Sequence, residues 1–280
     1  ALRGEALKRP PVWLMRQAGR TDPKYNALKE DLGLPLEALF RHPEHAATIS
    51  LLPQRIGVDA IIFFQDILTP LAPMGAEFVF RPGPTLDHPV RTPADVERLA
   101  SYVVPERLGF VGETFQLIHE RLDGALPVLG FAGAPWTLAV FLIEGGSFGR
   151  EAPTAMAFAR EHPEAMHALL EKLTVITVDY LHYQIESGAA AVQLFESGAY
   201  LLDGEAYRTF ALPYQQKIFA AIRGQAPTIN FARELNDLDL LEAARADVIS
   251  LPSTVSMAEA RARFGPDKVL QGNVSNRLVE

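Results

Sequence analysis

The chain contains no cysteine among its 280 residues, which excludes disulfide bonds and metal sites built from thiolates. It also lacks an apolar run long enough to cross a membrane, and its first residues lack the apolar core of a signal peptide. We therefore expect a protein of the reducing cytoplasm that does not bind membranes.

An excess of positive charge is absent too, because the formal net charge is −8 at pH 7. Overall charge of this sign does not favour nucleic acid or anionic lipid as a partner. An anionic ligand must then be held by a local cluster of arginines. The hydrophobic content of 48% supports a large core, and no linker composition or charge block interrupts the chain. We expect residues 1–280 to form a single domain.

Glycine motifs that bind phosphate are missing after every predicted strand. The glycine-rich stretch 145–149 follows a helical pattern instead, so a phosphate cradle is not predicted there. The seven histidines lie on predicted helices or loops. Two of them, His42 and His45, flank a proline, which is more typical of solvated histidines than of a metal site. The residues predict neither a metal nor an organic cofactor.

What the chain does contain is a regular alternation of two patterns. Near-continuous apolar runs predict strands at 11–15, 59–64, 126–131, 189–195, 226–231, 246–251 and 268–271. Amphipathic stretches predict helices at 43–56, 93–99, 108–122, 163–187, 204–223, 237–244 and 257–264, and segment 78–92 predicts a loop or hairpin insertion. This alternation favours a (β/α)8 TIM-type barrel whose eighth strand is absent from the chain. An open doubly wound sheet is the alternative, weakened by the missing phosphate motifs.

The first predicted strand ends in two arginines, Arg16 and Arg20, on either side of a small turn. Two guanidinium groups on a short glycine-containing turn can bind carboxylates or phosphates. The same pattern also fits two solvated surface arginines.

The ends of later strands carry further candidates. Asp66 is a lone carboxylate after an apolar run, which is costly unless the group is functional, paired or caps a helix. Small residues around Phe131 fit either the floor of a site for a flat apolar ligand or simple packing. One residue of the pair Glu196 and Ser197 is expected to meet a ligand and the other to cap the next helix. Together these residues predict an enzyme for a carboxylated, partly apolar small molecule.

Two long motifs are unusual enough to compare with known families: Pro-Val-Trp-Leu-Met-Arg-Gln-Ala-Gly-Arg at 11–20 and Gly-Phe-Ala-Gly-Ala-Pro-Trp-Thr-Leu at 130–138. With shorter motifs at 64–68, 144–146, 195–197, 210–214 and 270–273, the whole chain resembles the uroporphyrinogen decarboxylase family. The resemblance implies a homodimeric β/α barrel that needs no cofactor. It also implies that the four acetate side chains of uroporphyrinogen III become methyl groups, giving coproporphyrinogen III and CO₂.

The resemblance also implies roles for individual residues. Arg16 and Arg20 would bind substrate carboxylates and act as catalytic residues, with an arginine near the reacting acetate orienting it and relaying a proton. Asp66, also catalytic, would accept hydrogen bonds from the four pyrrole N–H groups. The implied substrate site further includes the backbone of Gln17, Ala18 and Gly19, the ring of Phe131, the ring of Phe141 and the hydroxyl of Ser197.

Several positions depart from the family pattern. Phe141 replaces a tyrosine, and losing a hydrogen bond to a charged group costs about 1.5–3 kcal/mol, so slower turnover is expected. Asp22 is expected to weaken carboxylate binding by the nearby arginines, and Leu251-Pro252-Ser253 replaces the usual Leu-Asp-Trp. The sequence also ends before the family's eighth strand and its Gly-His-Gly turn. We expect that unit to be missing from this sequence; the alternative is a barrel with an open seam.

These departures leave a second function open, namely a catalytically impaired homologue that binds tetrapyrroles. Two other classes on the same type of barrel are disfavoured. Zinc-dependent transfer of methyl groups from corrinoid proteins uses cysteine ligands, which this chain lacks. A sugar or phosphate enzyme is disfavoured by the motif match.

Overall fold

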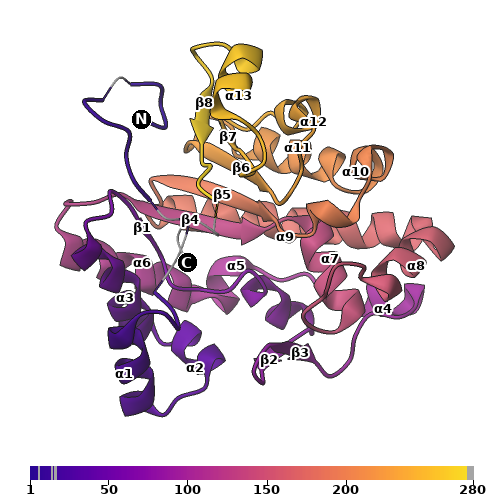
Figure 1. The fold of residues 1–280 in the computed structure, drawn as a ribbon. Coiled ribbons are helices and arrows are strands. Elements are labelled where there is room, and N and C mark those ends of the chain that lie inside the picture. The colour runs from indigo at the N-terminus through magenta and orange to yellow at the C-terminus, as the bar shows by residue number, and fades with distance from the viewer. Residues whose placement is uncertain (6, 14, 16–17, 276–280) are drawn as a thin grey trace.

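A parallel sheet of six strands forms the centre of the protein (Figure 1). The computed structural model describes residues 1–5, 7–13, 15 and 18–275. Neighbouring strands follow the order β1-β4-β5-β6-β7-β8, and every pair is parallel. Their bounds are β1 (Ile61–Ile62), β4 (Val128–Gly133), β5 (Ala191–Glu196), β6 (Thr228–Ala232), β7 (Val248–Ser250) and β8 (Val269–Gln271). Spatial order thus follows chain order, as in a β/α barrel, whereas a doubly wound sheet reverses direction at a switch point.

Helices connect these strands and cover the sheet. Before β1 come α1 (Pro23–Leu32), α2 (Leu36–Arg41), α3 (Pro43–Leu51) and η1 (Leu52–Ile56). Between β1 and β4 lie η2 (Thr69–Met74), the hairpin β2 (Phe78–Phe80) and β3 (Pro84–Leu86), α4 (Pro93–Arg98), α5 (Val104–Arg107) and α6 (Gly109–Leu122). The β4–β5 connection holds α7 (Pro135–Glu144), α8 (Pro153–Glu161) and α9 (Pro163–Glu186). The remaining elements are η3 (Ala199–Leu201), α10 (Gly204–Phe210), α11 (Leu212–Ala221), α12 (Leu238–Ala243) and α13 (Met257–Phe264).

The six strands predicted from residue 59 onward are confirmed, but the predicted strand at 11–15 is wrong for the residues that the structure describes there. The Val12 backbone forms two hydrogen bonds with Asp59, just before β1. Its N–H donates to the Asp59 carboxylate (2.6 Å), and its carbonyl accepts from the Asp59 N–H (2.9 Å). Met15 then has a φ of 50°, in the left-handed region that a strand cannot use. The segment therefore lies beside the sheet without joining it.

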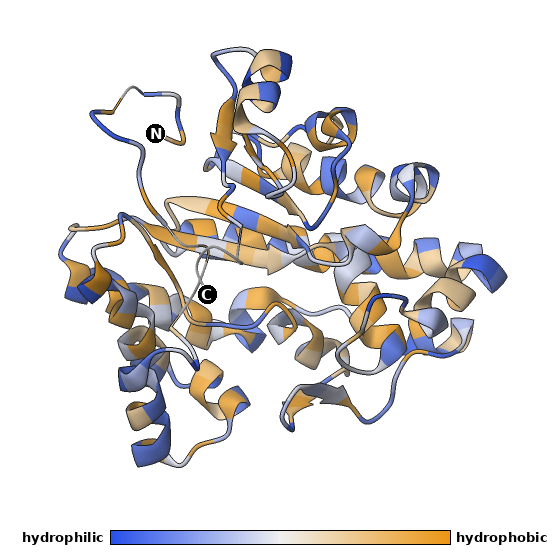
Figure 2. Cartoon of the chain, viewed as in Figure 1, coloured by the Kyte–Doolittle hydropathy of each residue, from blue (hydrophilic) through white to orange (hydrophobic). Residues whose placement is uncertain are grey.

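Each predicted helical stretch contains a helix, although 204–223 divides into α10 and α11. The helices α1, α2, α5 and α8 were not predicted, and α7 was predicted only as a helical pattern before residue 145. The start of α1 had a recognisable signal. Asp22 is its N-cap and accepts from the Lys24 N–H (2.9 Å), while Pro23 occupies the first helical position. Figure 2 shows α1 as largely hydrophilic, which explains why an apolar period did not reveal it.

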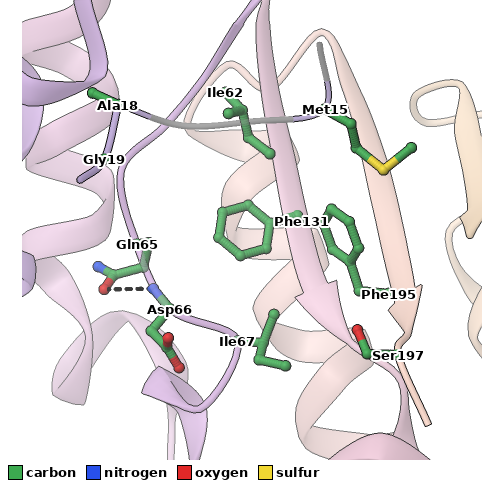
Figure 3. A pocket seen from close by; sticks show the side chains of 10 residues that line it. All are labelled: Met15, Ala18, Gly19, Ile62, Gln65, Asp66, Ile67, Phe131, Phe195 and Ser197. Carbon is green, nitrogen blue, oxygen red and sulfur yellow. Dashed lines mark hydrogen bonds between the residues drawn. The ribbon is translucent and has the colours of Figure 1, made fainter. Parts of the chain in front are cut away.

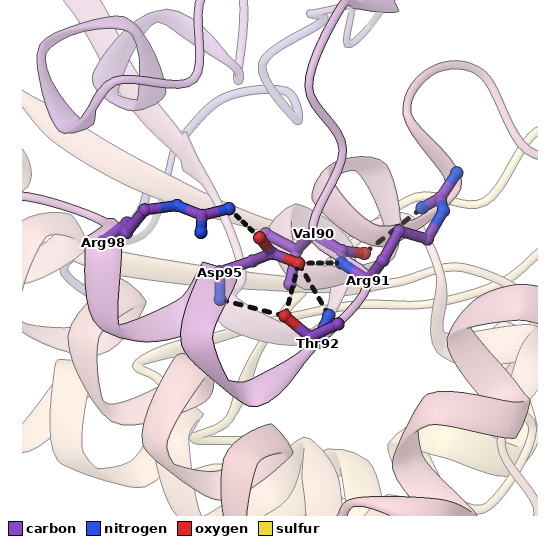
Figure 4. Close-up of polar contacts among 5 residues, drawn as sticks. All are labelled: Val90, Arg91, Thr92, Asp95 and Arg98. Carbon is purple, nitrogen blue, oxygen red and sulfur yellow. Dashed lines mark hydrogen bonds and ion pairs between the residues drawn. The ribbon is translucent and has the colours of Figure 1, made fainter.

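The predicted insertion at 78–92 forms the antiparallel hairpin β2–β3 and leads into α4. A capping box begins this helix (Figure 4). The Asp95 carboxylate accepts from the N–H groups of Thr92 (2.7 Å) and Arg91 (2.9 Å) and also pairs with Arg98. These contacts fix the point at which the chain returns from the hairpin to the helical layer.

A small second core attaches the N-terminal helices to the loop after β1. The ring of Phe64 packs against Tyr25 of α1 (5.8 Å between centroids) and Phe40 of α2 (4.9 Å). Ala18 is buried in the same cluster. This packing brings the turn at residues 18–20 to the carboxyl end of β1.

Candidate functional site

A cavity of about 360 Å³ opens at the carboxyl ends of β1, β4 and β5 (Figure 3). Its walls come from the N-terminal segment, from the loop after β1 and from two neighbouring strands. The lining residues are Met15, Ala18, Gly19, Ile62, Gln65, Asp66, Ile67, Phe131, Phe195 and Ser197. Active sites of β/α barrels lie at this end of the strands. The structure therefore brings together five of the predicted site residues: Ala18, Gly19, Asp66, Phe131 and Ser197.

Asp66 supplies the carboxylate of this cavity. Its Oδ1 accepts from the Leu68 N–H (2.8 Å), and its own N–H donates to Oε1 of the neighbouring Gln65 (3.2 Å). Among the described residues, no cation forms an ion pair with the Asp66 carboxylate. Burial raises the pKa of this carboxyl to about 6, and the Leu68 hydrogen bond offsets only part of that effect. Asp66 is therefore mainly ionised at pH 7 and can accept hydrogen bonds from a ligand.

Two phenylalanine rings form the apolar wall, since Phe131 and Phe195 meet edge to face with centroids 5.7 Å apart. The backbone of Phe131 is fixed by the buried Gln184 of α9. Its N–H donates to Oε1 of Gln184 (2.7 Å), and its carbonyl accepts from Nε2 (2.8 Å). A side chain at Gly130 would come within 2.5 Å of the same Oε1. The side-chain amide of Gln184 thus provides hydrogen-bond partners for the edge of β4 at Phe131, beyond the point where β1 has ended.

Ser197 lines the cavity, whereas its neighbour Glu196 points to the helical layer. Glu196 Oε1 accepts from the N–H (3.0 Å) and hydroxyl (2.5 Å) of Thr137, and Oε2 accepts from Gln215 (3.1 Å). Burial raises the pKa of Glu196 to about 7. Of the two predicted alternatives, Ser197 therefore faces the site and Glu196 caps a helix. That helix is the preceding α7, whose N-cap residue forms no side-chain cap.

The segment after Glu196 is held by the first turn of α7. The Gly198 N–H donates to the Thr137 hydroxyl (3.0 Å), and the Gly198 carbonyl accepts from the indole N–H of Trp136 (3.1 Å). Ser197 lies between these fixed neighbours, so its position at the cavity wall is set by the packing of β5 on α7.

The structure describes only part of the predicted arginine turn. Arg16 and Gln17 lie outside the described residues, and Arg20 is exposed and does not line the cavity. The negative charge expected beside it is already compensated. Asp22 caps α1 and pairs with Arg55 (2.5 Å), and these contacts hold the pKa of Asp22 below its ordinary value.

Phe141 does not contact the cavity either. Its ring packs against Phe148 (4.8 Å between centroids) and against Phe78 of the hairpin (6.3 Å). This arrangement joins α7 to the hairpin and to the glycine-rich stretch 145–149. The predicted contact of Phe141 with substrate stays a prediction.

Half of the residues that line the cavity were not predicted as site residues: Met15, Ile62, Gln65, Ile67 and Phe195. A signal existed for two of them. Phe195 precedes Ser197 by two positions and so faces the same side of β5, and Gln65 adjoins Asp66. The others are apolar residues without a chemical signature.

The described part of the chain offers neither a membrane-spanning helix nor a metal-binding cluster. No helix there has the length and apolar character needed to cross a membrane. No group of three or more His, Asp or Glu side chains is arranged there to hold a metal ion.

Comparisons with known proteins agree with the fold and the motifs. The family model "Uroporphyrinogen decarboxylase (URO-D)" matches residues 1–279. The uroporphyrinogen decarboxylase of Geobacter metallireducens is 41% identical over 280 residues, covering 99% of this chain and 81% of that protein. The enzyme of Streptomyces coelicolor is 42% identical over 285 residues, covering 100% and 79%. A methyltransferase from Methanosarcina mazei shares the fold, with a TM-score of 0.77 at 20% identity over 98% of this chain and 80% of its own. The chain therefore belongs to the uroporphyrinogen decarboxylase family.

Proposed function

We propose that this protein decarboxylates the four acetate side chains of uroporphyrinogen III to methyl groups, giving coproporphyrinogen III and CO₂. Membership of the uroporphyrinogen decarboxylase family makes it a carboxy-lyase of porphyrin biosynthesis. The observation that supports the proposal is the Asp66 carboxylate, which has no cationic partner among the described residues and lies in a cavity walled by Phe131 and Phe195. A domed macrocycle of four pyrroles, with apolar ring faces and four central N–H donors, matches that combination of surfaces.

The chemistry assigns Asp66 the central part. Protonation of a pyrrole carbon makes the ring cationic, and the C–C bond to the leaving carboxylate then breaks with its electron pair moving into the ring. A proton added to the resulting exocyclic methylene carbon, together with loss of the first proton from the ring carbon, gives the methyl group and restores the neutral pyrrole. Asp66 accepts hydrogen bonds from the pyrrole N–H groups and stabilises the cation electrostatically. Its pKa of about 6 keeps it anionic at neutral pH.

The other predicted site residues would bind and orient the substrate. We assign carboxylate binding to Arg16 and Arg20, together with the backbone of the turn from Gln17 to Gly19. Phe131 lies under the macrocycle, and the Ser197 hydroxyl contacts a propionate. Support for this arrangement comes from Ala18 and Gly19, which line the cavity on one side while Ser197 lines the other (Figure 3). We also assign a substrate contact to the ring of Phe141, which lies on α7 next to Phe78 and Phe148.

We further propose that residues 1–280 form one barrel domain and that the protein works in the cytoplasm as a homodimer. It would act without metal or organic cofactor and without nucleic acid or membrane partners. Sedimentation of the purified protein tests the dimer, and activity after treatment with chelator tests the absence of a metal.

The decisive experiment is anaerobic incubation with uroporphyrinogen III, followed by oxidation and chromatography of the porphyrins. We expect products with seven to four carboxylates from the wild-type protein. Asp66→Asn retains an oxygen for the Leu68 N–H but loses the charge, so its turnover should fall at least about 100-fold, as when a preorganised electrostatic group is removed. Asp66→Gly should abolish turnover while the protein stays folded.

The same experiment separates the second candidate function. Uroporphyrin bound without any CO₂ release would favour an impaired tetrapyrrole-binding homologue. Absence of both binding and product formation would contradict the proposal, and wild-type activity in Asp66→Gly would contradict the role of Asp66.

A further inference from the structure

Arg233 lies directly beside Ser197 at the carboxyl ends of β5 and β6. Glu196 and Ala232 are register partners, and the Arg233 N–H donates to the Glu196 carbonyl (3.0 Å). Ser197 and Arg233 are the residues that directly follow these two strands, so their backbones lie side by side. Because Ser197 lines the cavity, Arg233 begins beside the cavity wall.

Arg233 belongs to a cluster with Arg150, Tyr200 and Glu234. The guanidinium carbons of Arg233 and Arg150 lie 5.1 and 5.5 Å from the centroid of the Tyr200 ring. The Tyr200 hydroxyl donates to the Gly149 carbonyl (2.9 Å), which anchors the ring against the glycine-rich stretch. Cation–π contacts of this kind order arginine side chains at a surface. The cluster joins the segment at Gly149 and Arg150, the segment at Tyr200 and the turn that follows β6 beside Ser197.

The cluster carries more positive than negative charge. Glu234 pairs with Arg150 (2.6 Å) and more loosely with Arg233 (3.5 Å), so two guanidinium groups share one carboxylate. Within the described part of the chain, the two terminal nitrogens of Arg233 have no hydrogen-bond partner. Its side chain is 50% exposed and that of Arg150 is 72% exposed. Ordered, accessible guanidinium groups with free donors are suited to bind a carboxylate.

The cavity volume, compared with the size of the substrate, indicates what this cluster would bind. A volume of about 360 Å³ is near the lower end of the range of roughly 300–1,000 Å³ for small-molecule sites. A tetrapyrrole with eight carboxylate side chains is larger than such a space. Part of the substrate must therefore extend beyond the lining residues, and the carboxylates near Ser197 emerge toward Arg233.

We propose that Arg233 and Arg150, ordered on the ring of Tyr200, form a second carboxylate-binding site at the mouth of the cavity. Its ligand is an acidic side chain of the tetrapyrrole on the Ser197 side, across the cavity from the turn at residues 18–20. This inference rests on the proposed function. Glu234 occupies the site in the absence of substrate and competes with the incoming carboxylate.

The test measures KM and kcat for uroporphyrinogen III in Arg233→Gln and Arg150→Gln. Each arginine is partly exposed, so we expect KM to rise about threefold for each and about tenfold for the double variant, with kcat nearly unchanged. Arg160→Gln is the matched control. Arg160 is also 72% exposed and pairs with an adjacent glutamate, but it lies on α8 outside the cluster.

A second variant reverses the sign of the effect. Glu234→Gln frees both guanidinium groups from their carboxylate, so KM should fall about threefold. A merely structural role for the Glu234 ion pairs predicts the opposite result, namely a weaker site and a higher KM. Binding of uroporphyrin, followed by its fluorescence, should shift in the same directions without any turnover.

The outcomes distinguish this inference from the proposed function. If the wild-type protein converts uroporphyrinogen and the two arginine variants keep its KM within twofold, the second carboxylate site is wrong. An equal rise in KM in Arg160→Gln would also overturn it, because the effect would then reflect overall charge. A wild-type protein that neither turns over uroporphyrinogen nor binds uroporphyrin would overturn the proposed function itself, and the inference with it.

Discussion

Two carboxyl groups with raised pKa values lie within one strand-end layer, yet they face opposite sides of the sheet. Asp66 opens to the cavity and has one backbone donor on its carboxylate, whereas Glu196 is buried under α7 and α11 with three donors. Burial raises the pKa of both groups. Only the direction of the side chain separates a group that can meet substrate from one that holds the helical layer in place.

The titration of Asp66 should limit activity in mild acid. Below a pKa of about 6 the carboxyl binds a proton and loses its charge, so kcat/KM should fall about tenfold per pH unit. Unfolding is not the cause, because a carboxyl whose pKa is raised by folding stabilises the fold most when protonated, and that stabilisation is lost as pH rises from 3.8 through 6. A pH–rate profile with parallel circular dichroism tests this. Full kcat/KM at pH 5 in a folded protein would contradict it.

The titration of Glu196 should instead change the free energy of unfolding as a function of pH. Its folded pKa of about 7 exceeds the ordinary 4.5, so the fold binds the proton more tightly than the unfolded chain does. Wild-type stability relative to Glu196→Gln should therefore decrease by about 3 kcal/mol between pH 4 and pH 8. Urea denaturation at several pH values measures this difference, with Glu97→Gln on the exposed surface of α4 as the control. A difference independent of pH would argue against a buried, titrating Glu196.

At the scale of elements, α9 and β4 are joined by the double hydrogen bond of Gln184 to the backbone of Phe131. Gln184→Met preserves the length of the side chain but leaves a buried N–H and a buried carbonyl without partners. We expect the free energy of unfolding to fall by about 2–4 kcal/mol. Turnover should fall as well, since the position of Phe131 depends on that backbone.

Chemical denaturation and steady-state kinetics of the Gln184 variant test this prediction. Gln116→Met, on the exposed face of α6, is the matched control and should change stability by less than about 0.5 kcal/mol. Equal stability of the two variants would show that the amide does not complete the edge of β4.

At the scale of the whole molecule, the charge distribution is uneven, since a protein of net charge −8 gathers Arg150 and Arg233 in one cluster next to Ser197 of the cavity wall. At about 0.1 M salt the Debye length is about 10 Å, so a carboxylated substrate senses mainly the nearby guanidinium groups. We therefore expect KM for uroporphyrinogen to rise several-fold as salt increases from about 0.05 to 0.3 M. A fall in KM would mean that repulsion by the whole protein dominates instead.

The apolar pattern of the sequence explains how much of the fold could be predicted. Strands from residue 59 onward were recognisable because both faces of a parallel sheet are covered, so their sequences are continuously apolar. The segment at 11–15 has the same composition but bonds to the Asp59 side chain and turns at Met15, and composition records neither event. The short, polar α1 lacked an apolar period and could be found only through its Asp-Pro start.

For the site, the sequence by itself determined which residues have unusual chemistry: a lone aspartate after a strand, a serine after another and arginines on a turn. It also determined the family, because long motifs persist along the chain. The tertiary structure decided which of these residues share a cavity, that Glu196 turns away while Ser197 turns in, and that Arg233 lies beside Ser197. The physical reason is that strand register and packing between helix and sheet fix side-chain direction, and both depend on contacts between residues far apart in the chain.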